Sequence, residues 1–124
     1  MYTFSFEKLE VWIEANEFTK KIYHFTGTSF PESEKFGLIS QLKRASVSIC
    51  SNLAEGTSRN TFRDKAHFTT LAFGSAVEVL NQLIISYELG FLNEATYQDL
   101  RLQLESITNK LNALKKYQIS QMNK

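Results

Sequence analysis

Residues 62–89 of the chain read FRDKAHFTTLAFGSAVEVLNQLIISYEL. Apolar side chains in this stretch recur alternately four and three positions apart, which places them on one face of an α-helix. Thr61 precedes the stretch and Asp64 lies three residues later, a pattern that resembles a capping box, and Gly90 is typical of the position just past a helix. The stretch therefore predicts one long helix. Its stripe contains Phe62, Ala66, Thr69, Phe73, Ala76, Leu80, Leu83 and Tyr87.

Three further segments show the same spacing. Gly27 and Pro31 separate the first two segments, Gly56 is the expected end of the second, and Asn93 is the expected N-cap of the last. The first segment, from about residue 4 to residue 25, has a stripe of Val11, Ala15, Phe18, Ile22 and Phe25. The second begins near residue 32 and contains Leu38, Leu42, Ala45, Ile49 and Leu53. The last contains Tyr97, Leu100, Leu104, Ile107, Leu111 and Leu114.

The length and composition fit a single folded domain over residues 1–124. Hydrophobic residues are 43% and charged residues 22%, which is typical of folded soluble proteins rather than disordered ones. One proline and five glycines are too few for the turns of a many-stranded sheet. Because short connections make successive helices antiparallel, we expect an all-α fold, an antiparallel up-and-down four-helix bundle.

Several apolar residues of the first and third predicted helices fall outside the stripes. A second apolar face indicates contact with another subunit, so we expect a homo-oligomer. The alternative is that a four-helix core needs wide stripes in any case. The residues outside the stripes are Trp12, Tyr23, Phe68, Ala72, Val79 and Ile85.

The overall charge is close to neutral. Lys and Arg number 14 and Asp and Glu 13, and a net charge of +1 gives no strong overall attraction to nucleic acid or membrane. The single cysteine, Cys50, excludes an internal disulfide and a four-cysteine zinc site. The first residues lack the order of a signal peptide, and no apolar run approaches the roughly 20 residues of a membrane span. We therefore expect a cytoplasmic protein without membrane contact.

Five cations are close in sequence around the second predicted turn. Between residues 43 and 65 only Glu55 and Asp64 oppose them, so this region has a net charge of +3. Cations beside a helix N-terminus suit phosphate contacts, which predicts a nucleic-acid-binding surface. The alternative is a solvated loop with local ion pairs. The five cations are Lys43, Arg44, Arg59, Arg63 and Lys65.

A line of polar residues borders the apolar face of the second predicted helix. Its two charged members, Arg44 and Glu55, are too far apart to pair, so each needs a partner elsewhere, and Glu78 and Arg59 are candidates. The line predicts a polar network that fixes helix register, or else a binding site. It consists of Gln41, Arg44, Ser48, Asn52 and Glu55.

Few residues support catalysis. His24 and His67 are the only histidines, and Asp64-x-x-His67 is a single inexact copy of the Glu-x-x-His pair that di-iron bundles use twice. No histidine pattern marks Cys50 as a nucleophile, and there is no Gly-rich phosphate loop. Gly74, in the middle of a helix, predicts a close-packing point. We expect no enzymatic activity, no metal and no cofactor.

Motifs along nearly the whole chain resemble one family. The sequence has LEVW at residues 9–12, FPESEKFGL at 30–38, QLKRA at 41–45, NLAEG at 52–56 and AFGS at 72–75. NLAEG after QLKRA is a specific signature. With Ser48 and Glu78, these motifs resemble the bacterial four-helix-bundle family of 23S rRNA-intervening-sequence proteins.

The resemblance implies an up-and-down protomer, often assembled as a homopentameric barrel, without known enzymatic activity. A related branch, the accessory proteins of diversity-generating retroelements, binds a reverse transcriptase and nucleic acid through a basic surface. The resemblance also implies structural importance for a signature of Gln41, Arg44, Ser48, Asn52, Glu55, Gly56, Gly74, Ser75 and Glu78.

Two hypotheses for function follow. The first is a noncatalytic homo-oligomer that binds RNA or DNA through the basic cluster. The alternative is a protein-interaction scaffold or accessory module, such as a partner of a reverse transcriptase, which uses the apolar faces left outside the core.

Overall fold

The computed structural model describes all 124 residues as an all-helical protein without a β-strand, which confirms the predicted fold class. The long helices are α1 (Glu10–Thr28), α2 (Leu38–Thr57), α3 (Phe62–Glu88) and α4 (Glu94–Gln121). Two single-turn 3-10 helices, η1 (Ser5–Lys8) and η2 (Glu32–Glu34), precede α1 and α2.

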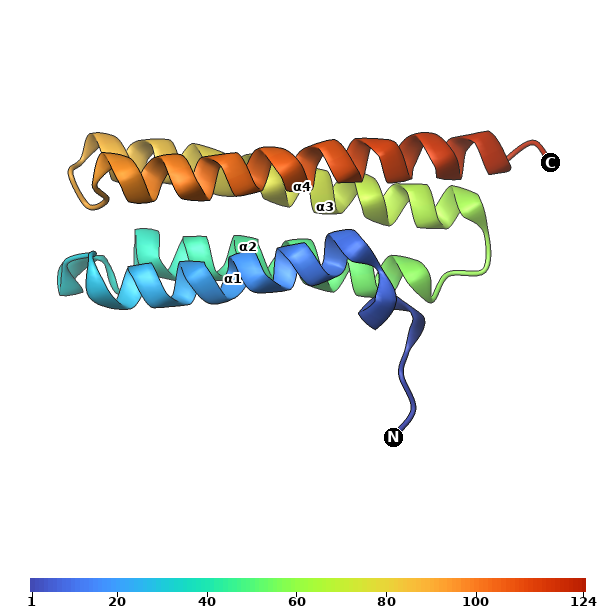
Figure 1. Ribbon diagram of the computed structural model, residues 1–124, viewed down its shortest axis with the longest axis horizontal. Helices are drawn as coiled ribbons and strands as arrows, with labels where there is room; N and C mark the ends of the chain where they lie inside the picture. Colours follow the sequence, from blue (N-terminus) through green and yellow to red (C-terminus); the bar gives the residue numbers. More distant parts are fainter.

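The four helices run alternately in opposite directions (Figure 1). Each helix packs against its neighbours in sequence, and α1 also packs against α4, so that the four close into one bundle. The first residues, the α2–α3 connection and the last turns of α4 lie at one end, on the right in Figure 1. The α1–α2 and α3–α4 connections lie at the other end.

The predicted helix caps of the second half of the chain are confirmed. The hydroxyl of Thr61 accepts a hydrogen bond from the backbone N–H of Asp64 at 3.1 Å. The side-chain oxygen of Asn93 accepts from the N–H of Thr96 at 2.8 Å. Gly90 has a φ of 83°, a left-handed conformation that ends α3 and favours glycine. These caps fix the turn between α3 and α4.

The predicted bounds of the first two helices are wrong. Residues before Glu10 form η1 instead of continuing α1, and α1 runs past Gly27 to Thr28. The segment after Pro31 forms only the single turn η2, because Gly37 has a non-helical backbone (φ −108°, ψ −115°) and interrupts it before α2 begins. Gly27 therefore does not end α1, whereas Gly37 separates η2 from the start of α2.

The buried face of α3 agrees with half of the predicted stripe, at Ala66, Thr69, Ala76 and Leu83, and differs in the rest. Ala72 and Val79 were expected outside the core, but both are fully buried, whereas Phe73 and Leu80 of the stripe are only half-buried. The small residues Ala72 and Ala76 let α3 approach its neighbours closely. Two of the residues expected to form a second apolar face are therefore buried in the core of the protomer.

Gly56, rather than Gly74, is the glycine at a close-packing point. A Cβ atom built on Gly56 would lie 3.0 Å from the Cβ of Phe68 on α3, whereas one on Gly74 would meet nothing within 4 Å. The predicted role of Gly74 inside the protomer is therefore wrong. The contact at Gly56 sets the separation of α2 and α3 where the two helices meet their connection.

The variant Gly56→Ala should lower the free energy of unfolding by about 1 kcal/mol. Overpacking against the fixed Cβ of Phe68 costs about 1–3 kcal/mol, and the better helix propensity of alanine returns about 1 kcal/mol. Gly27→Ala is the matched control, because nothing lies within 4 Å there. Urea unfolding followed by circular dichroism measures both variants, and an unchanged or increased stability of Gly56→Ala would contradict the expectation.

Candidate nucleic-acid interface

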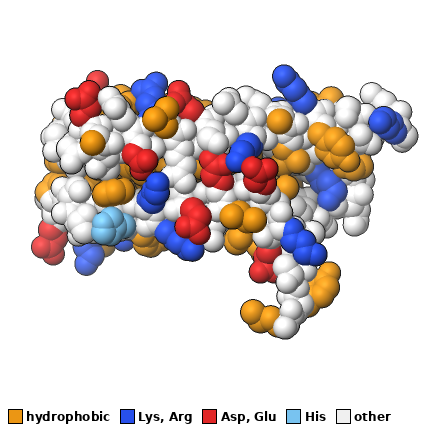
Figure 2. Space-filling model, viewed as in Figure 1, with side chains coloured by type: hydrophobic (Ala, Val, Ile, Leu, Met, Phe, Trp, Pro, Cys, Tyr) orange, Lys and Arg blue, Asp and Glu red, His pale blue; other side chains and the backbone are white.

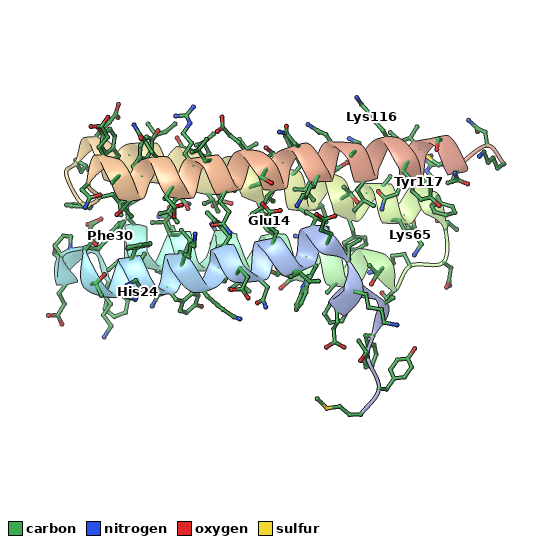
Figure 3. The ribbon with its side chains drawn as sticks, viewed as in Figure 1. Glu14, His24, Phe30, Lys65, Lys116 and Tyr117 are labelled. Carbon is green, nitrogen blue, oxygen red and sulfur yellow. The ribbon has the colours of Figure 1, made fainter.

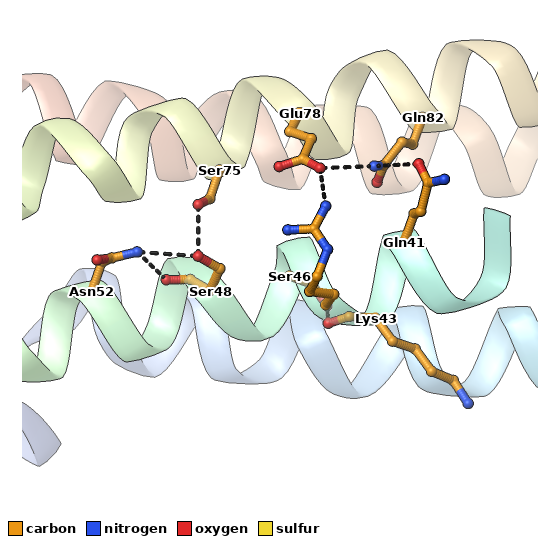
Figure 4. A network of polar contacts seen from close by, with 9 residues as sticks. Gln41, Lys43, Ser46, Ser48, Asn52, Ser75, Glu78 and Gln82 are labelled. Atoms are coloured by element: carbon orange, nitrogen blue, oxygen red, sulfur yellow. Dashed lines mark hydrogen bonds and ion pairs between the residues drawn. The ribbon is translucent and has the colours of Figure 1, made fainter. Parts of the chain in front are cut away.

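Most of the predicted polar line lies along the contact between α2 and α3 (Figure 4). The hydroxyls of Ser48 and Ser75 are 2.8 Å apart, and the amide of Asn52 donates to the carbonyl and hydroxyl oxygens of Ser48 at 2.9 and 3.1 Å. Further along, the amide of Gln82 donates to Gln41 at 3.4 Å. We call this set the polar ladder; it consists of Gln41, Arg44, Ser48, Asn52, Ser75, Glu78 and Gln82.

The two charged residues of the line, Arg44 and Glu55, form ion pairs with the partners predicted from the sequence. Arg44 forms an ion pair with Glu78 across the ladder, and Arg59 pairs with Glu55 one turn away at 2.9 Å. Gln82 adds a 3.2 Å hydrogen bond to Glu78. Both ion pairs are substantially exposed, so they contribute little to stability. The ladder joins two helices of the same chain, and its contacts favour a role in helix register.

The structure divides the five predicted cations into two groups. The ammonium of Lys43 lies 4.8 Å from the ring centre of Tyr23, and Arg44 pairs with Glu78, both along the side of the bundle. The other three, Arg59, Arg63 and Lys65, lie at the α2–α3 connection. The sequence cluster is therefore not a single surface.

The end of the bundle that carries the α2–α3 connection is strongly basic. We define the basic end as residues 1–9, 54–66 and 112–124, which contain seven Lys or Arg and three Asp or Glu, a net charge of +4. The opposite connections, residues 26–36 and 86–99, contain one Lys and five Asp or Glu, a net charge of −4. Figure 2 shows Lys and Arg at the right-hand end, with most Asp and Glu to their left. The near-neutral chain thus has a strong charge asymmetry along its axis.

Most cations of the basic end are free to bind an anion. Arg59 alone forms an ion pair there, and its guanidinium also lies 4.5 Å from the ring centre of Phe68. Lys65 donates to the carbonyl of Thr57 at 3.1 Å. Lys116 projects outward from α4, near Tyr117 (Figure 3). The cations without an ion pair are Lys8, Arg63, Lys65, Lys115, Lys116 and Lys124.

The prediction from sequence did not include four of these cations: Lys8, Lys115, Lys116 and Lys124. A signal was present, because the chain after Glu105 contains four lysines and no acidic residue. In addition, an up-and-down bundle of four helices must bring both ends of the chain and its second connection together. Charge pattern and topology had to be combined to find the surface.

A pocket of about 450 Å³ opens at the basic end. It lies between η1, the last turns of α2 and α4, and the first turns of α3. Lys8 and Lys65 line it, and no Asp or Glu does. Apolar walls come from Leu9, Leu53, Phe62, Leu114 and Tyr117.

The residues considered for catalysis do not form a cluster. His24 and His67 are exposed on different helices, beside the rings of Phe25 and Phe68. Burial raises the pKa of the Cys50 thiol, which disfavours the reactive thiolate. No group of three or more His, Cys, Asp or Glu side chains is placed to hold a metal ion.

The helix α3 has an uncharged outer face. Between Lys65 and Glu88 its only Asp, Glu, Lys or Arg is Glu78, which pairs with Arg44. By length and composition, α3 is apolar enough to cross a membrane, and the core helices of soluble proteins pass the same test. Core helices are mostly buried, whereas only 33% of the most apolar stretch of α3 is buried within the protomer. We define the outer face of α3 by its exposed residues His67, Thr70, Leu71, Gly74, Val77, Asn81 and Ile85.

Comparison with known proteins places this geometry in a family. No curated protein sequence matches the chain. A crystal structure of a protein of unknown function from the S23 ribosomal protein family of Bacteroides thetaiotaomicron superposes with a TM-score of 0.77 at 21% identity, over 86% of this chain and 98% of that one. The family model for 23S rRNA-intervening sequence proteins matches residues 7–113. Because that match spans most of the bundle, the chain belongs to the 23S rRNA-intervening sequence protein family.

Proposed function

We propose that the protein is a noncatalytic, homo-oligomeric bundle of the cytoplasm that binds RNA through its basic end. The observation that carries this proposal is the concentration of seven cations at one end of the bundle, six of them without an ion pair. Unpaired lysines and arginines bind phosphates by displacing counterions. The acidic opposite end orients the molecule on a polyanion.

RNA is favoured over other polyanions because of the family. Its description refers to an intervening sequence of 23S rRNA, which connects the family by name with RNA. DNA offers the same phosphates, so competition between RNA and DNA of matched length distinguishes the two ligands.

The direct test is binding of a fluorescein-labelled single-stranded RNA, followed by anisotropy over a range of salt concentrations. We expect the affinity to fall linearly with salt on a double logarithmic scale, because bound phosphates release counterions. Arg63→Glu should weaken binding about fivefold and lower the magnitude of the slope by about 0.7, the value of one phosphate contact to a single strand. Absence of binding at low salt would refute the proposal.

Assembly is proposed to use the outer face of α3. Seven exposed residues without a carboxylate, lysine or arginine form a surface that favours burial against another copy. Gly74 lies in the middle of this face with open space around it, so a helix of a second copy can approach closely. Family resemblance favours a pentamer, and light scattering measures the subunit number.

The same face is the basis of the alternative function, a scaffold that binds a different protein, such as a reverse transcriptase. Purification of the tagged protein from native lysate, followed by identification of the molecules bound to it, distinguishes the scaffold function from RNA binding. Recovery of one protein partner after nuclease treatment supports the alternative, whereas nuclease-sensitive recovery of RNA supports the first proposal.

A further inference from the structure

The pocket of the basic end contains a polar group without a partner. Gln118 on α4 is only 7% exposed, and its side-chain oxygen accepts a 2.7 Å hydrogen bond from the hydroxyl of Thr69. Its amide nitrogen donates to no atom of the chain. Gln118 lines the pocket and this nitrogen is not fully enclosed by the protein, so its N–H group is available to an acceptor that occupies the pocket.

An acceptor is available on the α2 side of the same pocket. The amide nitrogen of Asn52 is already used, since it donates twice to Ser48. Its side-chain oxygen makes no hydrogen bond, and Asn52 lines the pocket with Gln118. The pocket therefore presents one free donor and one free acceptor.

Aromatic rings and cations complete the lining. Phe62 and Tyr117 both contribute to the wall, with ring centres 6.1 Å apart and planes at 84°. Lys65 is held by its bond to Thr57, and Lys8 has no ion pair. A ligand that fits must therefore combine a flat apolar body, an edge with donors and acceptors, and negative charge.

We propose that this pocket takes one unstacked base of a single-stranded RNA, an inference that rests on the proposed RNA binding. The base lies against Phe62 and Tyr117, its edge bonds to Gln118 and Asn52, and the adjoining phosphates contact the two lysines. An aliphatic carboxylate would match the lysines but leave the oxygen of Asn52 without a donor. A base edge carries both donors and acceptors, and single-stranded RNA is recognised in this way.

The experiment uses the full chain and a single-stranded RNA of about 12 nucleotides that carries fluorescein and a central 5-iodouridine. Anisotropy measures binding, and irradiation followed by mass spectrometry locates the crosslinked residue. We expect the crosslink on Phe62 or Tyr117. Gln118→Met should weaken binding about fivefold, whereas Gln98→Met, on the exposed surface near the acidic end, should leave it unchanged. A duplex of the same sequence should not crosslink in the pocket, because its bases stay stacked.

The possible results separate this inference from the proposed function. Binding with crosslinks only outside the pocket, or with equal affinity for the Gln118→Met variant, overturns the inference and leaves RNA binding intact. No change in anisotropy at low salt overturns both. A third result is that free uridine monophosphate blocks crosslinking in the pocket at a lower concentration than unlabelled RNA does. The pocket would then be a site for small nucleotides, and the inference would also be overturned.

Discussion

Replacing Val77 with lysine should convert the proposed homo-oligomer into single protomers of 14.3 kDa. Val77 lies on the outer face of α3 and is 49% exposed in one protomer, so the protomer tolerates a lysine there. Burying that ammonium between apolar faces without a partner costs about 3 kcal/mol or more, which weakens each contact on the order of 100-fold. Light scattering at a fixed protein concentration measures the result.

The matched control is Leu102→Lys on α4. Leu102 is 67% exposed and apolar, but Asp99 and Glu105 lie one turn away on either side, unlike the uncharged surroundings of Val77. This variant should keep the mass of the unmodified protein. Circular dichroism checks that both variants are folded. A Val77→Lys protein that retains its assembly, or an unmodified protein of 14.3 kDa, would show that the face does not mediate self-association.

Local sequence signals predicted both ends of α3 and the start of α4 well, because caps and left-handed turns are formed by only a few residue types. Thr61, Asn93 and Gly90 stand where the backbone needs a cap or a left-handed residue, and each was identified from the sequence. The stripes of α1, α2 and α4 were also largely correct, because polar residues on their other faces leave one choice of buried face.

On α3 the same method identified only half of the buried residues, because few charged residues mark the exposed face. Periodicity selects a face only when polar residues contrast with it, and Ala72, Val79 and Leu80 are equally acceptable by hydropathy. Packing decides instead: small residues turn towards the neighbouring helices, and larger ones lie at the edges. The scarcity of charged residues that obscured the core also leaves the outer face of α3 uncharged.

The candidate site depended on distances that the linear sequence does not show. Lys8 and Lys115 are far apart in sequence, and their shared position follows from the even number of antiparallel helices. Conversely, Lys43 and Arg59 seemed close, but α2 carries the chain about 21 Å along its axis from Lys43 to its last residue, Thr57, at 1.5 Å per residue. The pocket could not be predicted, because it requires η1 to lie beside the ends of α2 and α4.

Reversing Lys115 and Lys116 to glutamate should cause the largest loss of RNA affinity. Both lie near the end of α4 in the basic end and neither forms an ion pair, so no internal partner is lost. In the proposed complex, the double variant would remove two phosphate contacts and place two carboxylates beside the RNA backbone. We expect affinity at low salt to fall at least about tenfold and the magnitude of the salt slope to fall by about 1.4.

Lys20→Glu with Lys21→Glu gives the matched control, since it changes the net charge by the same amount. These lysines lie on α1 and pair with Glu17 and Asp99, each at 3.1 Å, outside the basic end. If binding depended on net charge alone, the two double variants would lose affinity equally. If it depends on the location of the charge, the control should keep most of its affinity and its salt slope. Equal losses would therefore refute a localised interface even though RNA binding itself persisted.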